Sequence, residues 1–231
     1  MAVNIYYADI GRLLTVPGEY EKLMEHLSDE RCSKTLKIKH LEGKCRSVGA
    51  GLLLDKALSA YGLREKDMVY TYGKSGKPAF AGHPDLFFNL SHSGSRVMCI
   101  LADVPVGCDV EKIGKANPKI AKRFFTENEN MELDAAGSIG EQQYRELFYS
   151  YWTLKESFVK CTGQGLGCPF GSFSFTKEGN SYKIKDRPGY KFITFSDEER
   201  IGSAQSRYAY AVCLESKSIP KYSVEYIDIW S

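Results

Sequence analysis

The sequence has little excess charge and few histidines, and each shortage excludes a class of protein. Against 29 acidic residues stand 31 lysines and arginines, which leaves a formal net charge of +2, too small to indicate a strongly basic nucleic-acid-binding face. Only four histidines are present, and none is paired at metal-ligand spacing, which argues against a histidine-based metal site. No apolar run approaches the roughly 18 residues that span a bilayer. We therefore expect neither a nucleic-acid nor a membrane partner.

The seven cysteines are odd in number and scattered, and no two of them form a C-x-x-C pair. This usage is typical of reduced thiols in the cytosol and argues against a disulfide framework or a zinc site. The first residues, MAVNIYYADIGRLL, lack the charged start and long apolar core of a signal peptide. These features predict a cytoplasmic protein.

Composition and pattern predict a folded α+β protein. The sequence of 231 residues is 43% hydrophobic and 26% charged with no biased tract, as in globular chains, and its length allows one domain or two small ones. A capping box at 126–129 predicts a helix start. Apolar periodicity predicts further helices, over 19–35, 44–60, 118–125 and 141–162. Runs of β-branched and aromatic residues predict strands, over 3–10, 68–72, 86–91, 96–102, 105–111, 171–176, 181–185, 190–195, 207–214 and 222–228.

Two pairs of segments resemble each other at a separation of about a hundred residues. LLDKALSAYGL at 53–63 is similar to LKESFVKCTGQGL at 154–166, each a charged helix end followed by glycine. RVMCILADVPVGCDVE at 96–111 is similar to AYAVCLESKSIPKYSVEYI at 209–227. Chance likeness between short amphipathic elements is the alternative. A duplication predicts two α+β halves that meet near Pro105, with a ligand-binding cleft between them.

The segment CDVEK places two acidic side chains on one strand face. Asp109 and Glu111 are two residues apart, so both project the same way, roughly 6–7 Å apart along the strand. A strand end that meets solvent is the ordinary explanation. The functional alternative is a hard-cation site, since two carboxylates repel unless a cation or protons intervene. Oxygen ligands alone favour Mg²⁺ or Mn²⁺, and a third carboxylate from elsewhere would complete the site.

Three further segments offer anion-binding groups, and each also has an ordinary explanation. FNLSHSG at 88–94 carries Ser91 and His92 at a strand end, which is commonly only a turn. YGKSGKPAF at 72–80 superficially resembles a phosphate loop but lacks the full spacing and the trailing helix, so a hairpin with exposed lysines is the alternative. KTLKIKHLEGKCRS at 34–47 brings basic residues to a helix start, where they bind phosphate or form a solvated face.

YWTLKESFVK, residues 151–160, has the pattern of an amphipathic helix. Tyr151, Leu154 and Phe158 recur at the spacing of a buried face. Glu156 and Lys160 lie four residues apart, as in a surface ion pair. These ten residues alone favour the surface ion pair and leave open whether Glu156 binds something else.

Five segments occur in the order and approximate spacing of one enzyme family. They are GKP (76–78), FNLSHS (88–93), VGCDVE (106–111), KRFFTENE (122–129) and WTLKESFVK (152–160). Between about residue 30 and residue 176 the chain therefore resembles the 4′-phosphopantetheinyl transferase superfamily, in its larger, surfactin-synthetase-activating (Sfp-type) branch. The resemblance implies two pseudo-symmetric α+β halves with the active site between them: 1–105 for coenzyme A nucleotide contacts, and 106–231 for the metal carboxylates and the catalytic helix.

The resemblance also implies a reaction. Members of the family move the 4′-phosphopantetheine arm of coenzyme A to a serine of an apo acyl or peptidyl carrier protein of fatty-acid, polyketide or nonribosomal-peptide synthesis, and release 3′,5′-ADP. Matching positions imply that Mg²⁺, or Mn²⁺, is held by Asp109, Glu111 and Glu156. Glu156, Lys160 and His92 would be catalytic, with Glu156 or a water that it orients as general base. Implied coenzyme A contacts are Arg46, Lys77, Pro78, Ser91, His92, Lys160 and Lys39 or Lys44.

Two departures from the family pattern leave assignments open. KHLEGKCR shifts the basic residues before the first long helix, so Lys39 or Lys44 is expected in the 3′-phosphate role. An extra KS pair before GKP makes Lys74 an alternative to Lys77. The segment 131–144 is a candidate carrier contact or else a variable surface connection.

Two other functions are alternatives to a transferase. A non-catalytic coenzyme A or carrier-binding module has little reason to keep three carboxylates facing polyphosphate. A metal-dependent phosphohydrolase would use the same carboxylates but release free phosphopantetheine without a carrier. The chain is expected to be a monomer, because both halves of the cleft lie in one chain.

Overall fold

The computed structural model describes residues 2–179, 181–201 and 204–230 of the chain. The strands and helices of the first half are β1 (Ala2–Asp9), α1 (Gly11–Thr15), α2 (Glu19–Leu23), η1 (Met24–His26), α3 (Asp29–Lys37), α4 (Leu41–Ser59), η2 (Glu65–Asp67), β2 (Tyr70–Tyr72), β3 (Pro78–Phe80), β4 (Phe87–Ser93) and β5 (Arg96–Ala102). Those that follow are β6 (Val106–Lys112), α5 (Pro118–Phe124), α6 (Glu127–Ile139), α7 (Glu141–Thr162), η3 (Gly165–Gly167), η4 (Phe170–Ser172), β7 (Phe175–Glu178), β8 (Ser181–Ile184), β9 (Tyr190–Ile201), β10 (Ala204–Glu215) and β11 (Lys221–Tyr226).

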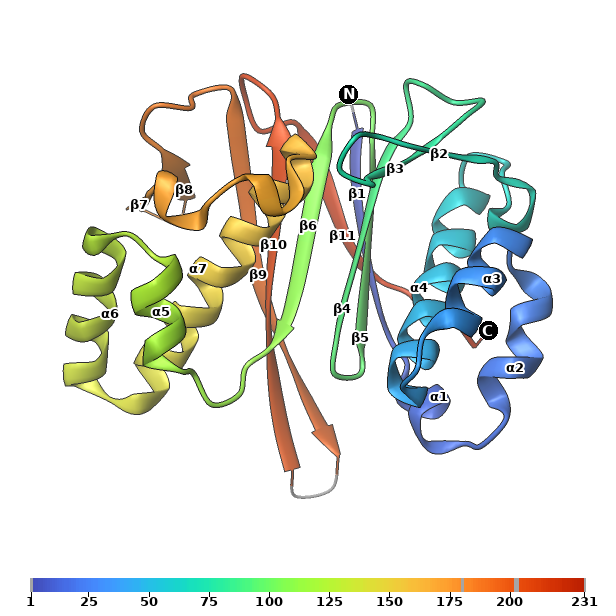
Figure 1. Cartoon of the computed structure of the whole chain (residues 1–231), viewed down its shortest axis with the longest axis horizontal. Helices are drawn as coiled ribbons and strands as arrows, with labels where there is room; N and C mark the ends of the chain where they lie inside the picture. The colour runs from blue at the N-terminus through green and yellow to red at the C-terminus, as the bar shows by residue number, and fades with distance from the viewer. Residues whose placement is uncertain (1, 180, 202–203, 231) are drawn as a thin grey trace.

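The strands form two sheets in the middle of the molecule, and helices cover both outer sides (Figure 1). One sheet has the strand order β11-β1-β5-β4 and the other the order β6-β10-β9. Three groups of buried hydrophobic residues fill the layers: one under α4, one under α7, and one shared by strands of both sheets. Because the shared core joins the sheets, the two halves form one continuous hydrophobic interior.

The two halves repeat the same plan, as the sequence similarity predicts. Each runs from a strand through short helices to one long helix, then through a two-stranded hairpin to two more strands. The strand order β1-β5-β4 in the first half matches β6-β10-β9 in the second, with antiparallel pairing throughout. The predicted α+β class with two pseudo-symmetric halves is confirmed.

The last strand does not stay with the second half. β11 pairs in parallel with β1, with Ile5 opposite Val224, and Ile229 behind it is buried in the core under α4. The predicted boundary near Pro105 lies in the turn between β5 and β6, but the segment after β10 returns to the first sheet. Short-range pattern cannot predict this pairing, because its partner lies more than 200 residues away.

Several predicted elements match the structure and a few do not. The helix over 141–162 has the bounds of α7, and the capping box at Thr126 and Glu129 is formed. The single helix expected over 19–35 is instead divided, because the Ser28 side chain accepts a hydrogen bond from the Arg31 amide and starts α3 there. The strand expected over 171–176 begins with the turn η4, and β7 starts only at Phe175.

The two sheets meet at an unusual junction between β4 and β6. Instead of a backbone ladder, side chains of β4 accept hydrogen bonds from backbone amides of β6. The three bonds are Cys108 N to Asn89 Oδ1 (2.9 Å), Val110 N to Ser91 Oγ (3.3 Å) and Lys112 N to Ser93 Oγ (3.1 Å). We call this set of bonds the β4/β6 seam. Asn89, Ser91 and Ser93, the residues of the FNLSHS motif that face β6, therefore each have a structural role.

Candidate active site

The acidic strand and the long helix cross at a glycine. A Cβ atom built on Gly107 would lie 2.1 Å from the Ser157 carbonyl oxygen and 2.3 Å from the Cys161 amide nitrogen. Only a residue without a side chain allows β6 and α7 to approach so closely. The crossing brings Asp109 on β6 beside Lys160 on α7. The glycine of VGCDVE therefore sets the distance between the two motifs.

Asp109 lies at the centre of the polar groups at this crossing. Its side chain is almost fully buried, and its Oδ1 accepts hydrogen bonds from Lys160 Nζ at 2.7 Å and from Ser91 Oγ at 2.7 Å. Its other oxygen, Oδ2, is buried and has no hydrogen-bond partner in the described part of the chain. A buried carboxylate oxygen without a partner is costly unless a cation or proton occupies its lone pairs.

Two more carboxylates face the same place. Burial, the charge of Asp109 and, to a lesser degree, that of Glu156 raise the pKa of Glu111 to about 7, against the Ser93 hydroxyl that donates to it at 2.6 Å. Burial and Asp109 also raise the pKa of Glu156, although Lys160 opposes this shift. Each of these shifts reflects unfavourable charge in the metal-free protein, which a bound cation would relieve.

This donor set fits a hard divalent cation. Asp109 offers its unpartnered oxygen, and Glu111 and Glu156 offer carboxylates on flexible side chains beside it. Among the described residues no three acidic, histidine or cysteine side chains already surround one metal position. One oxygen of Asp109 is bonded to Lys160 and one of Glu111 to Ser93. Oxygen donors of this kind select Mg²⁺ or Mn²⁺.

The ammonium of Lys160 remains charged at this position. Burial opposes its charge, but Asp109 and, more weakly, Glu156 outweigh that effect, and the pKa of Lys160 is raised. The ion pair recorded for Lys160 is with Asp109 rather than with Glu156. The i, i+4 pair on α7 is thus no simple surface salt bridge.

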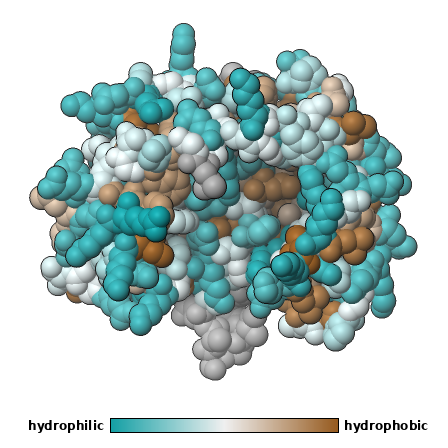
Figure 2. Space-filling model, in the orientation of Figure 1, coloured by the Kyte–Doolittle hydropathy of each residue, from teal (hydrophilic) through white to brown (hydrophobic). Residues whose placement is uncertain are grey.

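A cleft of about 800 Å³ opens beside these groups. Glu156 and Lys160 line it from α7, and Lys77, Pro78 and Asn89 line it from the first half. Figure 2 shows hydrophobic surface gathered in a hollow between the halves, with hydrophilic residues around it. The apolar wall consists mainly of Phe124, Trp152, Val159 and Phe170. A ligand with a charged end and an extended, weakly polar part would match this lining.

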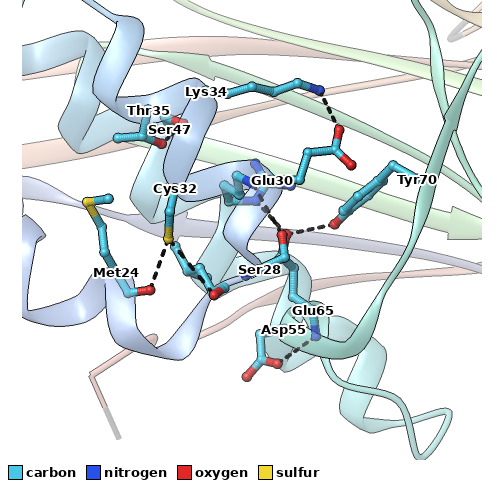
Figure 3. Close-up of polar contacts among 12 residues, drawn as sticks. Met24, Ser28, Glu30, Cys32, Lys34, Thr35, Ser47, Asp55, Glu65 and Tyr70 are labelled. Atoms are coloured by element: carbon cyan, nitrogen blue, oxygen red, sulfur yellow. Dashed lines mark hydrogen bonds and ion pairs between the residues drawn. The ribbon is translucent and has the colours of Figure 1, made fainter.

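A smaller recess of about 190 Å³ joins the cleft at Pro78 and Asn89. Arg31 and Lys34 from α3, Ser47 from α4 and Tyr70 from β2 line it. Figure 3 shows Lys34 and Ser47 on neighbouring helices, with Lys34 paired to Glu30 at 3.0 Å. Apart from Glu30, these are basic and hydroxyl groups suited to an anion. Lys34 and Ser47 lie at the ends of the basic segment 34–47 identified in the sequence, whereas Arg31 and Tyr70 were not identified there.

Glu65, a fully buried carboxylate, contacts two of the residues that line this recess, Arg31 and Tyr70 (Figure 3). Glu65 accepts hydrogen bonds from Ser28 N (2.7 Å), Arg31 Nε (2.7 Å) and Tyr70 OH (2.7 Å). These donors satisfy the oxygens of a carboxylate that has no access to water. Glu65 therefore fixes α3 and Tyr70 in place, so that the guanidinium of Arg31 is positioned before any ligand arrives.

The other basic residues named from the sequence lie at the edge. Arg46 on α4 is half-buried and donates to Glu42 Oε2 at 3.3 Å and to the Gly94 carbonyl oxygen at 3.5 Å. Lys39 is exposed between α3 and α4, and Lys44 is half-buried in the first turns of α4. Of the lysines near this helix start, it is Lys34 that lines the recess.

His92 lies on β4 near Arg46 and Lys160. Loss of hydration, together with these two positive charges, lowers its pKa, against a hydrogen bond to its own backbone and the charge of Asp109. The imidazole is therefore neutral at physiological pH and acts as a hydrogen-bond donor or acceptor rather than as a cation. Ser91 on the same strand is buried and already bonded to Asp109 and Lys160.

A second carboxylate–lysine pair supports the cleft from behind. Lys155 is fully buried, and its Nζ donates to Glu129 Oε2 at 2.9 Å and to the carbonyl oxygens of Phe170 at 2.8 Å and Phe173 at 2.9 Å. Burial lowers the pKa of Lys155, and Glu129 opposes this. The pair fixes the turn η4, which carries the aromatic side chain of Phe170 into the cleft wall.

Sequence reasoning missed the aromatic wall, although a signal was present. Trp152, Glu156 and Lys160 follow one another at intervals of four residues, so all three lie on one face of α7. The opposite face, with Tyr151, Leu154 and Phe158, is fully buried as predicted. The face of α7 that lines the cleft is therefore continuous from the indole of Trp152 to the ammonium of Lys160.

Three carboxylates, an ammonium and a neutral imidazole beside a large cleft define a class of site. They are the groups that metal-assisted transfer of a phosphoryl-type group requires, namely hard-cation ligands, phosphate contacts and a candidate base. Residues 105–213 match the family model of the 4′-phosphopantetheinyl transferase superfamily.

Related proteins extend this match over most of the chain. A 4′-phosphopantetheinyl transferase of Bacillus subtilis is 34% identical over 215 residues, 91% of this chain and 92% of that protein. The 4′-phosphopantetheinyl transferase Sfp of Bacillus subtilis (strain 168) is 36% identical over 157 residues, 68% of this chain and 69% of that protein. The chain belongs to the 4′-phosphopantetheinyl transferase superfamily, and the resemblance seen in the motifs is confirmed.

A solved structure aligns with part of the chain. A holo-(acyl-carrier-protein) synthase from Bacillus anthracis in complex with CoA (3′,5′-ADP) is 20% identical and covers 49% of this chain and 96% of that one, with a TM-score of 0.34. In the described part of the chain no helix is long and apolar enough to cross a membrane.

Proposed function

We propose that this protein transfers the 4′-phosphopantetheine moiety of coenzyme A to a serine of an apo carrier protein and releases 3′,5′-ADP. The family supports the reaction. The observation that carries the proposal is the unpartnered Asp109 Oδ2, buried beside Glu111, Glu156 and Lys160 at the rim of the cleft. A transferase that handles a pyrophosphate needs a cation at such a position.

Asp109, Glu111 and Glu156 would hold Mg²⁺, or Mn²⁺, against the pyrophosphate of coenzyme A. When bound there, the ion neutralises charge on the phosphate oxygens. The ammonium of Lys160 donates hydrogen bonds to the same oxygens, and neutral His92 donates another. The carrier serine oxygen forms a bond to the phosphorus of the pantetheine phosphate, and the bond from that phosphorus to the bridging oxygen of the pyrophosphate breaks.

The serine proton must leave during this step. Glu156 is the candidate acceptor, either directly or through a water that it orients. Its place on the cleft wall leaves it accessible to the serine hydroxyl. Lys160 then stabilises the departing phosphate of 3′,5′-ADP.

We place coenzyme A across the cleft and the adjoining recess. Arg46, Pro78, Ser91 and His92, with Lys39 or Lys44 at the outer edge, stay proposed contacts. Lys34 is added because it lines the recess beside Ser47, where it would bind the 3′-phosphate. The apolar wall at Trp152 and Phe170 accommodates the weakly polar pantetheine arm. Lys77 also lines the cleft.

The partner is a carrier protein of fatty-acid, polyketide or nonribosomal-peptide synthesis. The segment 131–144 stays a proposed contact, and its helix α6 exposes Met131 and Ile139. We also propose that the protein is a monomer, because each half supplies one wall of the same cleft within one chain. We propose the cytoplasm as its location. Size-exclusion chromatography with light scattering tests the monomer.

The experiment is to incubate the protein with coenzyme A, Mg²⁺ and a panel of apo carrier proteins, and to weigh each carrier by mass spectrometry. We expect one carrier to gain the mass of one phosphopantetheine, and EDTA to abolish the gain. Absence of the added mass on every carrier would refute the proposal. Coenzyme A binding without transfer would indicate a binding module, and free phosphopantetheine without carrier a phosphohydrolase.

A further inference from the structure

Side chains of the first half bind the backbone groups of β6 along the edge that faces β4. Alternate residues of a strand present their backbone groups on the same side. Cys108, Val110 and Lys112 present their amides toward β4, where the β4/β6 seam binds them. Val106 has the same parity, so its carbonyl oxygen faces the same way. Lys77 Nζ donates to that oxygen at 2.8 Å.

The same ammonium also reaches the long helix. Lys77 Nζ donates to the Cys161 carbonyl oxygen at 2.9 Å, in the last turn of α7. Carbonyl groups in a last helical turn have no partner within the helix, and they carry the negative end of the helix dipole. A lysine at this position therefore satisfies an acceptor that the helix leaves free.

Lys77 thus binds strand and helix at the point where they cross. Val106 precedes Gly107, and Cys161 is the residue whose amide lies closest to the built Cβ of that glycine after the Ser157 oxygen. Gly107 permits the close approach, and Lys77 fastens it from the other half of the molecule. Asp109 lies two residues beyond Gly107, and Lys160 directly precedes Cys161.

We infer that Lys77 is a positioning residue: its ammonium holds β6 against the end of α7 and so fixes Asp109 relative to Glu156 and Lys160. The catalytic part of this inference rests on the proposed transferase function. A lysine that serves mainly as a phosphate ligand would present its ammonium to solvent or to the cleft, as exposed Lys74 does three residues earlier. The bonds of Lys77 are instead directed at two carbonyl groups of the protein itself.

The test compares Lys77→Met with the control Lys74→Met in the full chain. Two measurements need neither coenzyme A nor carrier: the melting temperature, and amide hydrogen exchange over residues 157–165. We expect Lys77→Met to lower the melting temperature and to speed exchange over this segment by about tenfold or more, since hydrogen bonds to a charged group have at least that effect. Lys74→Met should leave both unchanged.

Two further measurements use the ligand. Coenzyme A affinity is measured by calorimetry without Mg²⁺, and transfer to an apo carrier by mass spectrometry. For a positioning residue the dissociation constant and the KM for coenzyme A should stay within about twofold of wild type while kcat falls by about tenfold or more. A variant with wild-type exchange and stability but much weaker coenzyme A binding would overturn the inference and make Lys77 a phosphate ligand.

If Lys77→Met does not fold, Lys77→Gln replaces it, because its amide still donates to one carbonyl group. Faster exchange over residues 157–165 in this variant supports the inference, and wild-type exchange overturns it. If the wild-type protein modifies no carrier, the proposed function fails, and the exchange and melting measurements still decide whether Lys77 joins β6 to α7.

Discussion

Replacing Gly107 with alanine tests how far the site depends on the crossing of β6 and α7. The added methyl group would lie 2.1 Å from the Ser157 carbonyl oxygen and 2.3 Å from the Cys161 amide nitrogen. A carbon–oxygen contact normally needs roughly 3.3 Å. Both neighbours are backbone atoms of α7, so no rotamer change can relieve the clash. The helix must move by about 1 Å.

That displacement has two consequences of different size. Overpacking of this kind costs about 1–3 kcal/mol in free energy of unfolding, which corresponds to a fall in melting temperature of about 2–12 °C for a chain of this length. The distance of 2.7 Å between Lys160 Nζ and Asp109 Oδ1 would lengthen beyond hydrogen-bond range. A misplacement of about 1 Å in a catalytic constellation can lower the rate about a hundredfold.

The assay is the transfer of phosphopantetheine to an apo carrier, with a thermal melt of the same samples. Gly82→Ala is the control, because nothing lies within 4 Å of a Cβ atom built there. We expect Gly107→Ala to lose far more activity than stability and Gly82→Ala to lose neither. A Gly107→Ala protein that melts and transfers like wild type would show that the crossing does not set the geometry of the site.

Three other predictions follow from the charges. Asp109→Asn should lower Mg²⁺-dependent transfer by about a hundredfold or more, with the exposed Asp85→Asn as control; full activity in Asp109→Asn would place the metal elsewhere. Because the pKa of Glu111 is raised from 4.5 to about 7, its protonated form is favoured in the metal-free fold. Metal-free stability should therefore fall as pH rises from about 4.5 through 7, and Mg²⁺ should restore it; a melting temperature that stays flat over this range in wild type, or falls equally in Glu111→Gln, would contradict this. Lys155→Met should cost about 3–5 kcal/mol by urea denaturation, because it leaves the charge of Glu129 buried without its cation. Lys155→Met with Glu129→Gln removes that charge and keeps an oxygen for the amide of Thr126 or that of Phe175, so it should recover part of the loss; a double variant no more stable than the single one would contradict it.

The parts of the site that repeat at short range could be predicted from the sequence. Asp109 and Glu111 share a strand face because strand side chains alternate, and Glu156 and Lys160 share a helix face because four residues make about one turn. Neither spacing shows that the two elements cross. That step came from the family resemblance, and the structure adds the physical reason in Gly107.

Longer-range contacts could not be predicted from pattern. The sequence left open which lysine of the segment 34–47 contacts phosphate. Lys34 lines the recess, because the position of α3 depends on the buried bonds of Glu65. Lys155 directly precedes Glu156 in the sequence, and in the structure it points inward to Glu129. The pairing of β11 with β1 likewise depends on packing that no local window contains.

The β4/β6 seam has a consequence for how the two halves are encoded. A backbone ladder forms with almost any sequence, since every residue but proline carries the same donor and acceptor. At the seam one side of each bond is an amide or hydroxyl of Asn89, Ser91 or Ser93. The bonds that join the halves at the seam therefore depend on which side chains stand at alternate positions of β4. Ser93→Ala, which replaces the hydroxyl with hydrogen, would remove one of the three bonds and leave the backbone pairing of β4 with β5 in place.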